Sequence, residues 1–237
     1  MTSLNDGTGT VTVSSSDRIS YQRTTPIAPF NANISLTITV RDDSDADGQI
    51  TTSTATPFNA IAFDSGNEFR FGRLALRNAN GSQLVPLAVP LETQYWGYTN
   101  PPTNTVLGFI TNKDDSCTTL AGANIMLSNP QGGFTVPPGS CTTSASNPVS
   151  FGNGRGNLIM PKPSGGAVGS DDLTVNLGTT ASGNTCVGGS SVAHSAASKT
   201  YLQGAWTGGT YTVNPSARAT FGVYKGSDEV IFIRENF

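Results

Sequence analysis

Residues 43–49 have the composition and spacing of a calcium-binding loop. Three carboxylates at alternate positions are followed by a glycine and an amide: Asp43, Asp45, Asp47, Gly48 and Gln49. Hard oxygen ligands that converge on a sharp turn suit Ca²⁺. The twelfth position is Thr54, where an EF-hand has a bidentate glutamate, so an EF-hand is excluded. Two alternatives remain, a calcium site of another kind and an acidic, solvated turn between strands.

Aromatic residues form a second candidate site. Tyr95, Trp96 and Tyr98 are close together in the sequence, and Trp206 and Tyr211 follow much later. Aromatic faces stack on the apolar faces of sugars, so Tyr95, Trp96 and Trp206 could form a platform for a glycan ligand. The alternative is that these rings fill the protein core or close loops.

The sequence contains few residues in a pattern that is typical of catalysis. His194 is the single histidine, it lies in a Ser/Ala-rich segment, and no G-x-S-x-G motif is present. A glycosidase needs a pair of carboxylic acids at its active site. The sequence does not exclude such a pair, but it contains only four glutamates. We therefore expect no enzyme and no catalytic residue, with a glycoside hydrolase as the remaining catalytic alternative.

Three cysteines lie in Gly/Ser/Thr-rich contexts: Cys117, Cys141 and Cys186. None is part of a C-x-x-C pair, so zinc and thioredoxin-like sites lack their spacing. We expect one disulfide and an oxidising compartment. Cys117 with Cys141 closes the shortest loop, and every pairing leaves one thiol over; three unpaired cysteines are the alternative.

Asp114 and Asp115 precede Cys117, and they bind either a cation or the loop backbone through Asx-turns.

Charge and the distribution of apolar residues argue against two further classes of protein, those that bind nucleic acid and those that insert into a membrane. The formal net charge is −3, only 12% of residues are charged, and no window is rich in Lys or Arg. Nucleic-acid binding through a basic face is therefore not expected. No window approaches 18 consecutive apolar residues, so membrane insertion is not expected either.

These candidate residues must be positioned by strands. Gly, Thr, Ser and Asn make up 102 of the 237 residues, whereas Lys and Glu number four each, a composition with little material for exposed helices. Apolar and polar residues alternate in several segments, and turn signals separate them. The predicted strands are 33–40, 69–76, 83–90, 106–111, 154–160, 173–177, 217–224 and 230–234. Asn78–Ser82 and Asp171–Asp172 are predicted turns. The fold class expected is all-β, an antiparallel β-sandwich of Ig-like or jelly-roll-like type with long Gly/Ser/Thr-rich loops.

Several ordered blocks resemble one family. They are FRFGRLALRNANGSQLVPL at 69–87, QYW at 94–96, FITNKDDSCT at 109–118, PSARATFGVYKG at 215–226 and IFIRENF at 231–237. Together they resemble the C-terminal domain of MshQ-like proteins, which are surface proteins associated with the mannose-sensitive haemagglutinin (type IV) pilus. The resemblance covers residues 66–237. Residues 1–65 are expected to be an Ig-like or strand-rich N-terminal part, unless the two parts form one continuous domain.

The resemblance implies an exported, extracellular domain at the cell surface. We expect a structural or interaction domain of a bacterial pilus or surface assembly, one that could self-assemble by strand addition. Its partners would be other copies of itself or pilus and surface proteins. The alternative is a carbohydrate-binding adhesin module whose partners are surface glycans. Calcium is the one cofactor that the sequence suggests.

Overall fold

A computed structural model describes residues 21–31, 68–134, 148–181 and 195–222 with their side chains. Outside these ranges it describes only the backbone of residue 135 and of six short strands. These strands are β1 (Thr2–Leu4), β2 (Thr8–Thr10), β3 (Asn33–Leu36), β4 (Phe58–Ala62), β14 (Asn184–Val187) and β15 (Ser190–Ala193). They pair as three antiparallel ladders, β1 with β2, β3 with β4 and β14 with β15.

The first main sheet is organised around one long strand, β7 (Leu87–Tyr98). β5 (Gly72–Leu76) runs antiparallel along one edge of β7. β12 (Arg155–Met160) pairs with the first half of β7, and β8 (Leu107–Thr111) pairs with its second half. Backbone bonds at Thr93 join the two halves, because its N–H donates to the carbonyl of Gly154 and its carbonyl accepts from Asn112, both at 2.8 Å.

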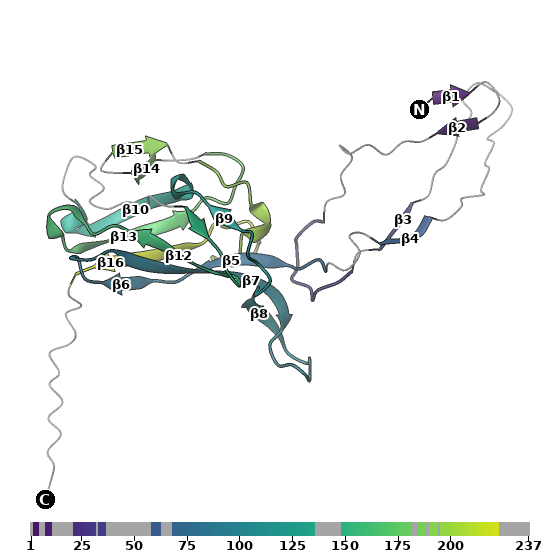
Figure 1. The fold of residues 1–237 in the computed structure, drawn as a ribbon, viewed down its shortest axis with the longest axis horizontal. Helices are drawn as coiled ribbons and strands as arrows, with labels where there is room; N and C mark the ends of the chain where they lie inside the picture. The colour runs from purple at the N-terminus through teal and green to yellow at the C-terminus, as the bar shows by residue number, and fades with distance from the viewer. Residues whose placement is uncertain are drawn as a thin grey trace, which may run out of the picture.

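The second main sheet has the order β10, β13, β16, β6. β10 (Ile125–Gly132), β13 (Gly169–Val175) and β16 (Ser216–Phe221) are antiparallel neighbours, and β6 (Ala79–Gly81) is parallel to β16. The two sheets lie as layers in Figure 1. The predicted all-β sandwich is confirmed, with the parallel β6–β16 pair as an exception to antiparallel pairing.

The core lies between the inner faces of these sheets. Strand residues alternate between faces with period two, and the burial of β7 follows this rule from Leu87 to Leu91. The most deeply buried side chains come from both sheets and are apolar. They include Leu74, Val89, Leu91, Leu158, Met160, Ile125, Leu173, Val175, Ala219 and Phe221.

Two predicted turns are wrong. The segment expected to turn at Asn78–Ser82 contains β6, which leaves the first sheet and joins the second beside β16. Asn78 fixes this crossing, because its side-chain oxygen accepts a hydrogen bond from the Arg218 N–H at 2.8 Å. Asp171 and Asp172 lie inside β13 rather than in a turn. Local sequence signals do not specify such crossings, which depend on pairing with distant strands.

The other predicted strands correspond in part to observed ones. The chain forms β8, β12 and β16 close to the expected places, whereas the strand expected at 83–90 begins at Leu87 and continues to Tyr98. β3 covers the start of the strand expected at 33–40, and the strand expected at 230–234 lies outside the described residues.

Short elements complete the described fold. β9 (Thr119–Leu120) pairs with β11 (Val149–Ser150). Four short 3-10 turns are η1 (Gly122–Asn124), η2 (Gly133–Thr135), η3 (Ser164–Gly166) and η4 (Thr200–Leu202). In the described part of the chain, no helix has the length and apolarity needed to cross a membrane.

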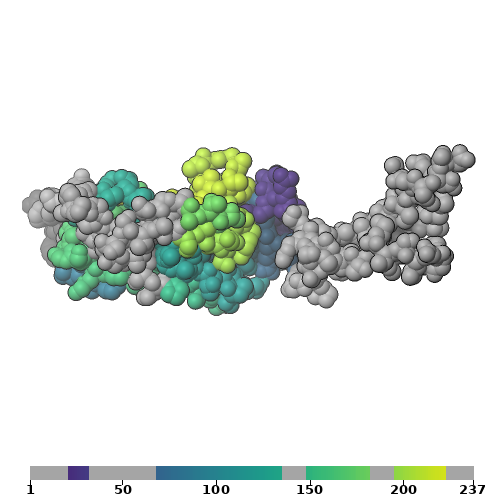
Figure 2. Space-filling view, turned by 90° about the horizontal axis from the view of Figure 1, so that it is seen from above, coloured from purple at the N-terminus to yellow at the C-terminus, as the bar shows by residue number. Residues whose placement is uncertain are grey.

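The 21–31 segment is attached to the sandwich. Phe30 and Phe69 exchange two backbone hydrogen bonds, and their rings stack with centroids 5.6 Å apart. The Arg23 guanidinium donates to the carbonyls of Gly72, Thr200 and Gln203. Figure 2 shows this segment against residues 195–222.

Candidate functional site

The outer face of β7 carries a row of polar and aromatic side chains. Glu92, Gln94, Trp96 and Tyr98 alternate with residues of the opposite face, so they share one side of the strand. Arg73 on β5 lies opposite Gln94, Arg155 on β12 lies opposite Glu92, and Phe109 on β8 lies opposite Trp96. The strand register therefore assembles this face from segments that are far apart in the sequence.

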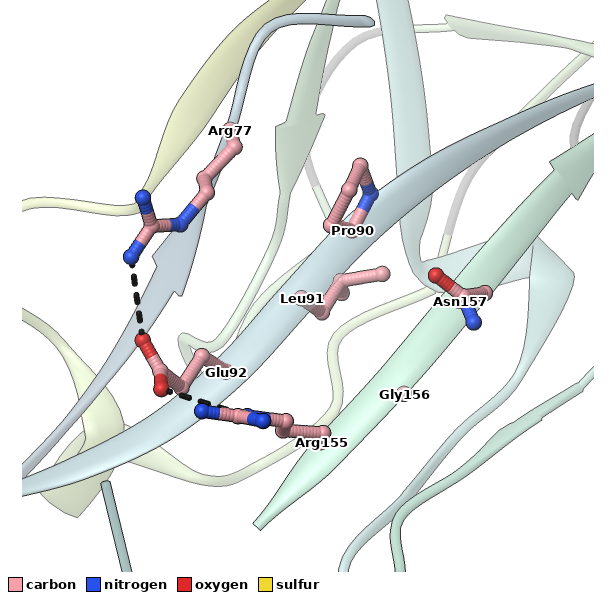
Figure 3. Close-up of a pocket in the computed structure, with 7 residues that line it drawn as sticks. All are labelled: Arg77, Pro90, Leu91, Glu92, Arg155, Gly156 and Asn157. Carbon is pink, nitrogen blue, oxygen red and sulfur yellow. Dashed lines mark hydrogen bonds and ion pairs between the residues drawn. The ribbon is translucent and has the colours of Figure 1, made fainter.

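A pocket of about 290 Å³ opens at the Glu92 end of this face. Figure 3 shows Glu92 between two arginines, with Arg77 on one side and Arg155 on the other. The Arg77 Nη2 atom lies 3.4 Å from Glu92 Oε2, and the Arg155 Nε atom lies 3.7 Å from Glu92 Oε1. Pro90, Leu91, Gly156 and Asn157 complete the lining. We call this site the arginine pocket.

Glu92 is a buried carboxylate with several donors. Its side chain is 11% exposed. It accepts hydrogen bonds from the Thr111 hydroxyl and from the Gln94 amide, the latter at 2.8 Å. Burial alone would raise the pKa of Glu92, but bonds from Thr111, Gln94 and Arg77 outweigh it and hold the pKa below its usual value. Glu92 is therefore ionised at neutral pH and forms ion pairs with Arg77 and Arg155.

Arg73 connects the polar end of the face to its aromatic end. Its Nε donates to Gln94 Oε1 at 2.8 Å. Its guanidinium carbon lies 3.6 Å from the ring centroid of Phe109 and 4.6 Å from that of Trp206. Trp96 meets Phe109 edge to face with centroids 5.1 Å apart. Such cation–π and edge-to-face contacts hold the rings in fixed orientations.

The aromatic end continues onto the hairpin of β7 and β8, which projects from the sandwich in Figure 1. Trp96 pairs with Phe109 across the strands, and Tyr98 pairs with Leu107. Gly97 and Gly108 pair between them and belong to the opposite face. Trp96, Tyr98, Leu107 and Phe109 thus form one row, which we call the apolar stripe.

The structure separates the three residues predicted as a glycan platform. Trp96 and Trp206 both belong to the cluster around Arg73 and Phe109. Tyr95 lies on the other face of β7, where the Arg70 guanidinium covers its ring at 4.6 Å from the centroid. A flat platform of all three rings is therefore not present, whereas glycan binding by the other two stays a prediction.

In the loop at Asp114–Cys117, both aspartates bind protein groups, as expected for a structural role. Asp115 Oδ1 accepts the backbone N–H groups of Cys117 at 3.2 Å and Thr118 at 3.0 Å, which closes an Asx-turn. Asp114 pairs with Arg70 at 2.6 Å. The Cys117 thiol is free and exposed. No disulfide is therefore seen at Cys117, and the predicted Cys117–Cys141 pairing is not shown. Cys141 lies outside the described residues and Cys186 is described only in its backbone, so a disulfide between these two stays a prediction.

The predicted calcium ligands, Asp43, Asp45, Asp47 and Gln49, lie outside the described residues, as does His194. Across the ranges that the structure describes, no group of three or more His, Cys, Asp or Glu side chains has the arrangement of a metal site. Calcium binding at residues 43–49 therefore stays a prediction.

A pair of adjacent carboxylates lies on β13. Asp172 faces outward, where Arg218 Nε donates to it at 2.8 Å and Asn129 at 2.9 Å. Asp171 is 5% exposed. Burial raises the pKa of Asp171 to about 6, and the neighbouring charge of Asp172 adds to the rise. The two carboxylates thus have opposite environments on consecutive residues.

No motif in the sequence predicts the arginine pocket. Arg77, Glu92 and Arg155 are isolated charges in the sequence, without a motif between them. The available signal was weak: Glu92 is one of only four glutamates and lies within an otherwise uncharged strand. A buried carboxylate in such a strand requires partners from other strands, but the sequence does not say which ones.

The fold defines the chain as a two-sheet β-sandwich domain. The chain belongs to the DUF6701 family, since the profile of the family's fourth domain matches residues 70–236. This match does not by itself link the chain to MshQ-like proteins. No curated protein and no solved structure matches the chain.

Proposed function

We propose that this chain is an interaction domain of an extracellular pilus or cell-surface assembly and acts by binding rather than by catalysis. The observation that carries the proposal is the apolar stripe on the projecting β7–β8 hairpin. The exposed fractions are 40% for both Tyr98 and Leu107 and 53% for the adjacent Val106. Contiguous exposed apolar residues on a soluble domain commonly mark a protein interface.

The composition of the stripe supports protein binding. Trp, Tyr, Phe and Arg are enriched at interfaces, and a few of them contribute most of the binding energy. Trp96 and Phe109 contact each other, and Arg73 fixes Phe109 from the other side. Side chains that are already ordered lose less entropy on binding.

The tip of the hairpin is also ordered. The Asn100 amide donates to the hydroxyls of Thr103 at 2.7 Å and Thr105 at 2.8 Å. Its carbonyl oxygen accepts the Val106 N–H at 2.9 Å. These bonds close the loop and present Tyr98 and Leu107 on a fixed scaffold, which suits a docking element.

The surface assembly itself is inferred from sequence. The blocks that resemble MshQ-like proteins, with few charged residues and loop cysteines, support an exported pilus-associated domain. Partners would be further copies of this chain or other surface proteins. The C-terminal segment that strand addition would use lies outside the described residues. At the N-terminal end, the backbone is described for β1 and β2, which pair with each other.

The test is binding with a matched apolar control. We would measure self-association by sedimentation velocity and binding of the labelled domain to cells of its own strain. Tyr98→Ser with Leu107→Ser should abolish either interaction, whereas Leu84→Ser, at a residue 68% exposed and outside the stripe, should leave it unchanged. Equal binding by the stripe variant and the wild type, or no binding by the wild type in both assays, would reject the proposal.

A further inference from the structure

We propose that the arginine pocket binds the carboxylate of an acidic sugar, of the uronic-acid class, through Arg77 and Arg155. This site lies on the same face of β7 as the apolar stripe but uses different residues. It therefore does not depend on the proposed protein interaction.

Both arginines keep most of their donors available. A guanidinium has five N–H donors in a planar fork. Arg77 directs its Nη2 to Glu92, and Arg155 approaches Glu92 only with its Nε. No other hydrogen bond from either side chain occurs within the described ranges. The two side chains are 69% and 73% exposed, so their free donors are open to a ligand.

Glu92 orients the arginines without neutralising both. It carries one negative charge against two positive charges, and Thr111 and Gln94 already donate to its oxygens. The pocket therefore has a net charge of about +1 from its own ionised groups. A planar carboxylate matches the guanidinium fork in geometry and charge.

The rest of the lining favours a sugar over an acidic peptide side chain. The pocket volume of about 290 Å³ is more than a lone carboxylate needs. Asn157 projects from β12 on the same face and offers an amide for hydroxyl groups, and Pro90 provides an apolar wall. A sugar ring with several hydroxyls can contact both the Asn157 amide and Pro90. An aspartate or glutamate side chain is too small to contact either of them while its carboxylate is bound by the arginines.

The surface next to the pocket extends the argument to an oligosaccharide. Gln94 and Trp96 follow Glu92 at two-residue spacing on the same face. At roughly 3.3 Å per residue, Trp96 lies about 13 Å along the strand from Glu92. Neighbouring sugar units can therefore lie along β7 from the arginine pocket toward an aromatic ring.

The experiment compares three probes by isothermal titration calorimetry at low and at moderate salt. The probes are oligogalacturonate, a neutral oligosaccharide of the same length and a poly-glutamate peptide. We expect binding of oligogalacturonate alone, weakened by salt. The double substitution Arg77→Gln with Arg155→Gln should reduce affinity about tenfold or more, because bonds to a charged group are lost.

Three further variants distinguish binding in the pocket from binding elsewhere on the surface. Lys162→Gln removes an exposed positive charge outside the pocket and should leave binding unchanged. Asn157→Ala should weaken binding while keeping both arginines, and it tests the pocket if the double variant does not fold. The Tyr98→Ser with Leu107→Ser variant should still bind the sugar, so failure of the protein interaction is distinguishable. Equal binding of the peptide or the neutral sugar, no binding of oligogalacturonate, or full binding by the pocket variants would overturn the proposal.

Discussion

The guanidinium of Arg73 lies over the ring of Phe109, with its central carbon 3.6 Å from the ring centroid. Arg73 comes from β5 and Phe109 from β8, which pair with opposite edges of β7. The contact therefore joins three strands across their outer face. Because Arg73 also covers the Trp206 ring, it ties the loop after η4 to the same surface.

Replacing Arg73 should loosen this cluster. Arg73→Lys keeps the charge but loses the planar stacking and the fork that reaches Gln94. We expect a loss of about 1 kcal/mol in the free energy of unfolding. Tryptophan fluorescence should shift to longer wavelength as Trp206 becomes more exposed. Arg77→Lys, which has no aromatic contact among the described residues, should leave the emission spectrum unchanged; the same red shift in both variants would contradict the assignment.

Asp171 should make stability depend on pH in an unusual direction. Its folded-state pKa of about 6 lies above the ordinary value of 3.8, so the folded chain holds this proton more tightly than the unfolded chain does. The contribution of Asp171 to stability is therefore largest below pH 4 and falls as the pH rises to about 6. Asp171→Asn should remove this fall and stabilise the protein by about 1–2 kcal/mol at pH 7.5. Chemical denaturation of both proteins from pH 3.5 to 7.5 measures the difference.

The adjacent carboxylate supplies the opposite control. Arg218 and Asn129 bind Asp172, and these bonds hold its pKa below the ordinary value despite some burial. Asp172→Asn should therefore lower stability at neutral pH, and its effect should diminish toward low pH. Parallel pH profiles for the two asparagine variants would contradict the opposite environments assigned to Asp171 and Asp172.

Gly154 should not tolerate a side chain. Its φ is +73°, and a Cβ there would collide with the carbonyl oxygen of Asn112, where β8 and β12 meet beside β7. Gly154→Ala should lower the free energy of unfolding by about 3 kcal/mol. Gly152→Ala is the matched control, because a Cβ at Gly152 meets no atom within 4 Å. Thermal unfolding of both variants tests the prediction, and equal melting temperatures would contradict it.

Arg23 should contribute to stability from outside the region matched by the family profile. Its guanidinium binds three carbonyls and lies 4.6 Å from the centroid of the Phe71 ring. Arg23→Ala should destabilise the sandwich by about 1–2 kcal/mol and expose the segment at 21–31 to proteases. The exposed neighbour Gln22→Ala should change neither property. If both variants unfold like the wild type, the segment does not stabilise the fold.

Much of the fold was predictable from local sequence. The scarcity of Lys and Glu, the abundance of Thr and the alternation in segments such as 154–160 and 217–224 indicated strands and a sandwich. These signals are local, because which side of a strand a residue faces depends only on its parity. The same rule explains why Tyr95 and Trp96, adjacent in sequence, lie on opposite faces.

Tertiary structure alone decided which strands pair and therefore which side chains meet. The transfer of β6 to the second sheet and the burial of Asp171 depend on neighbours far along the chain. The arginine pocket combines Arg77, Glu92 and Arg155, which are 15 and 63 residues apart in succession (92 − 77 and 155 − 92). Strand register places them side by side. The alternation of apolar residues restricts the possible registers, but which strands become neighbours depends on pairing between distant segments.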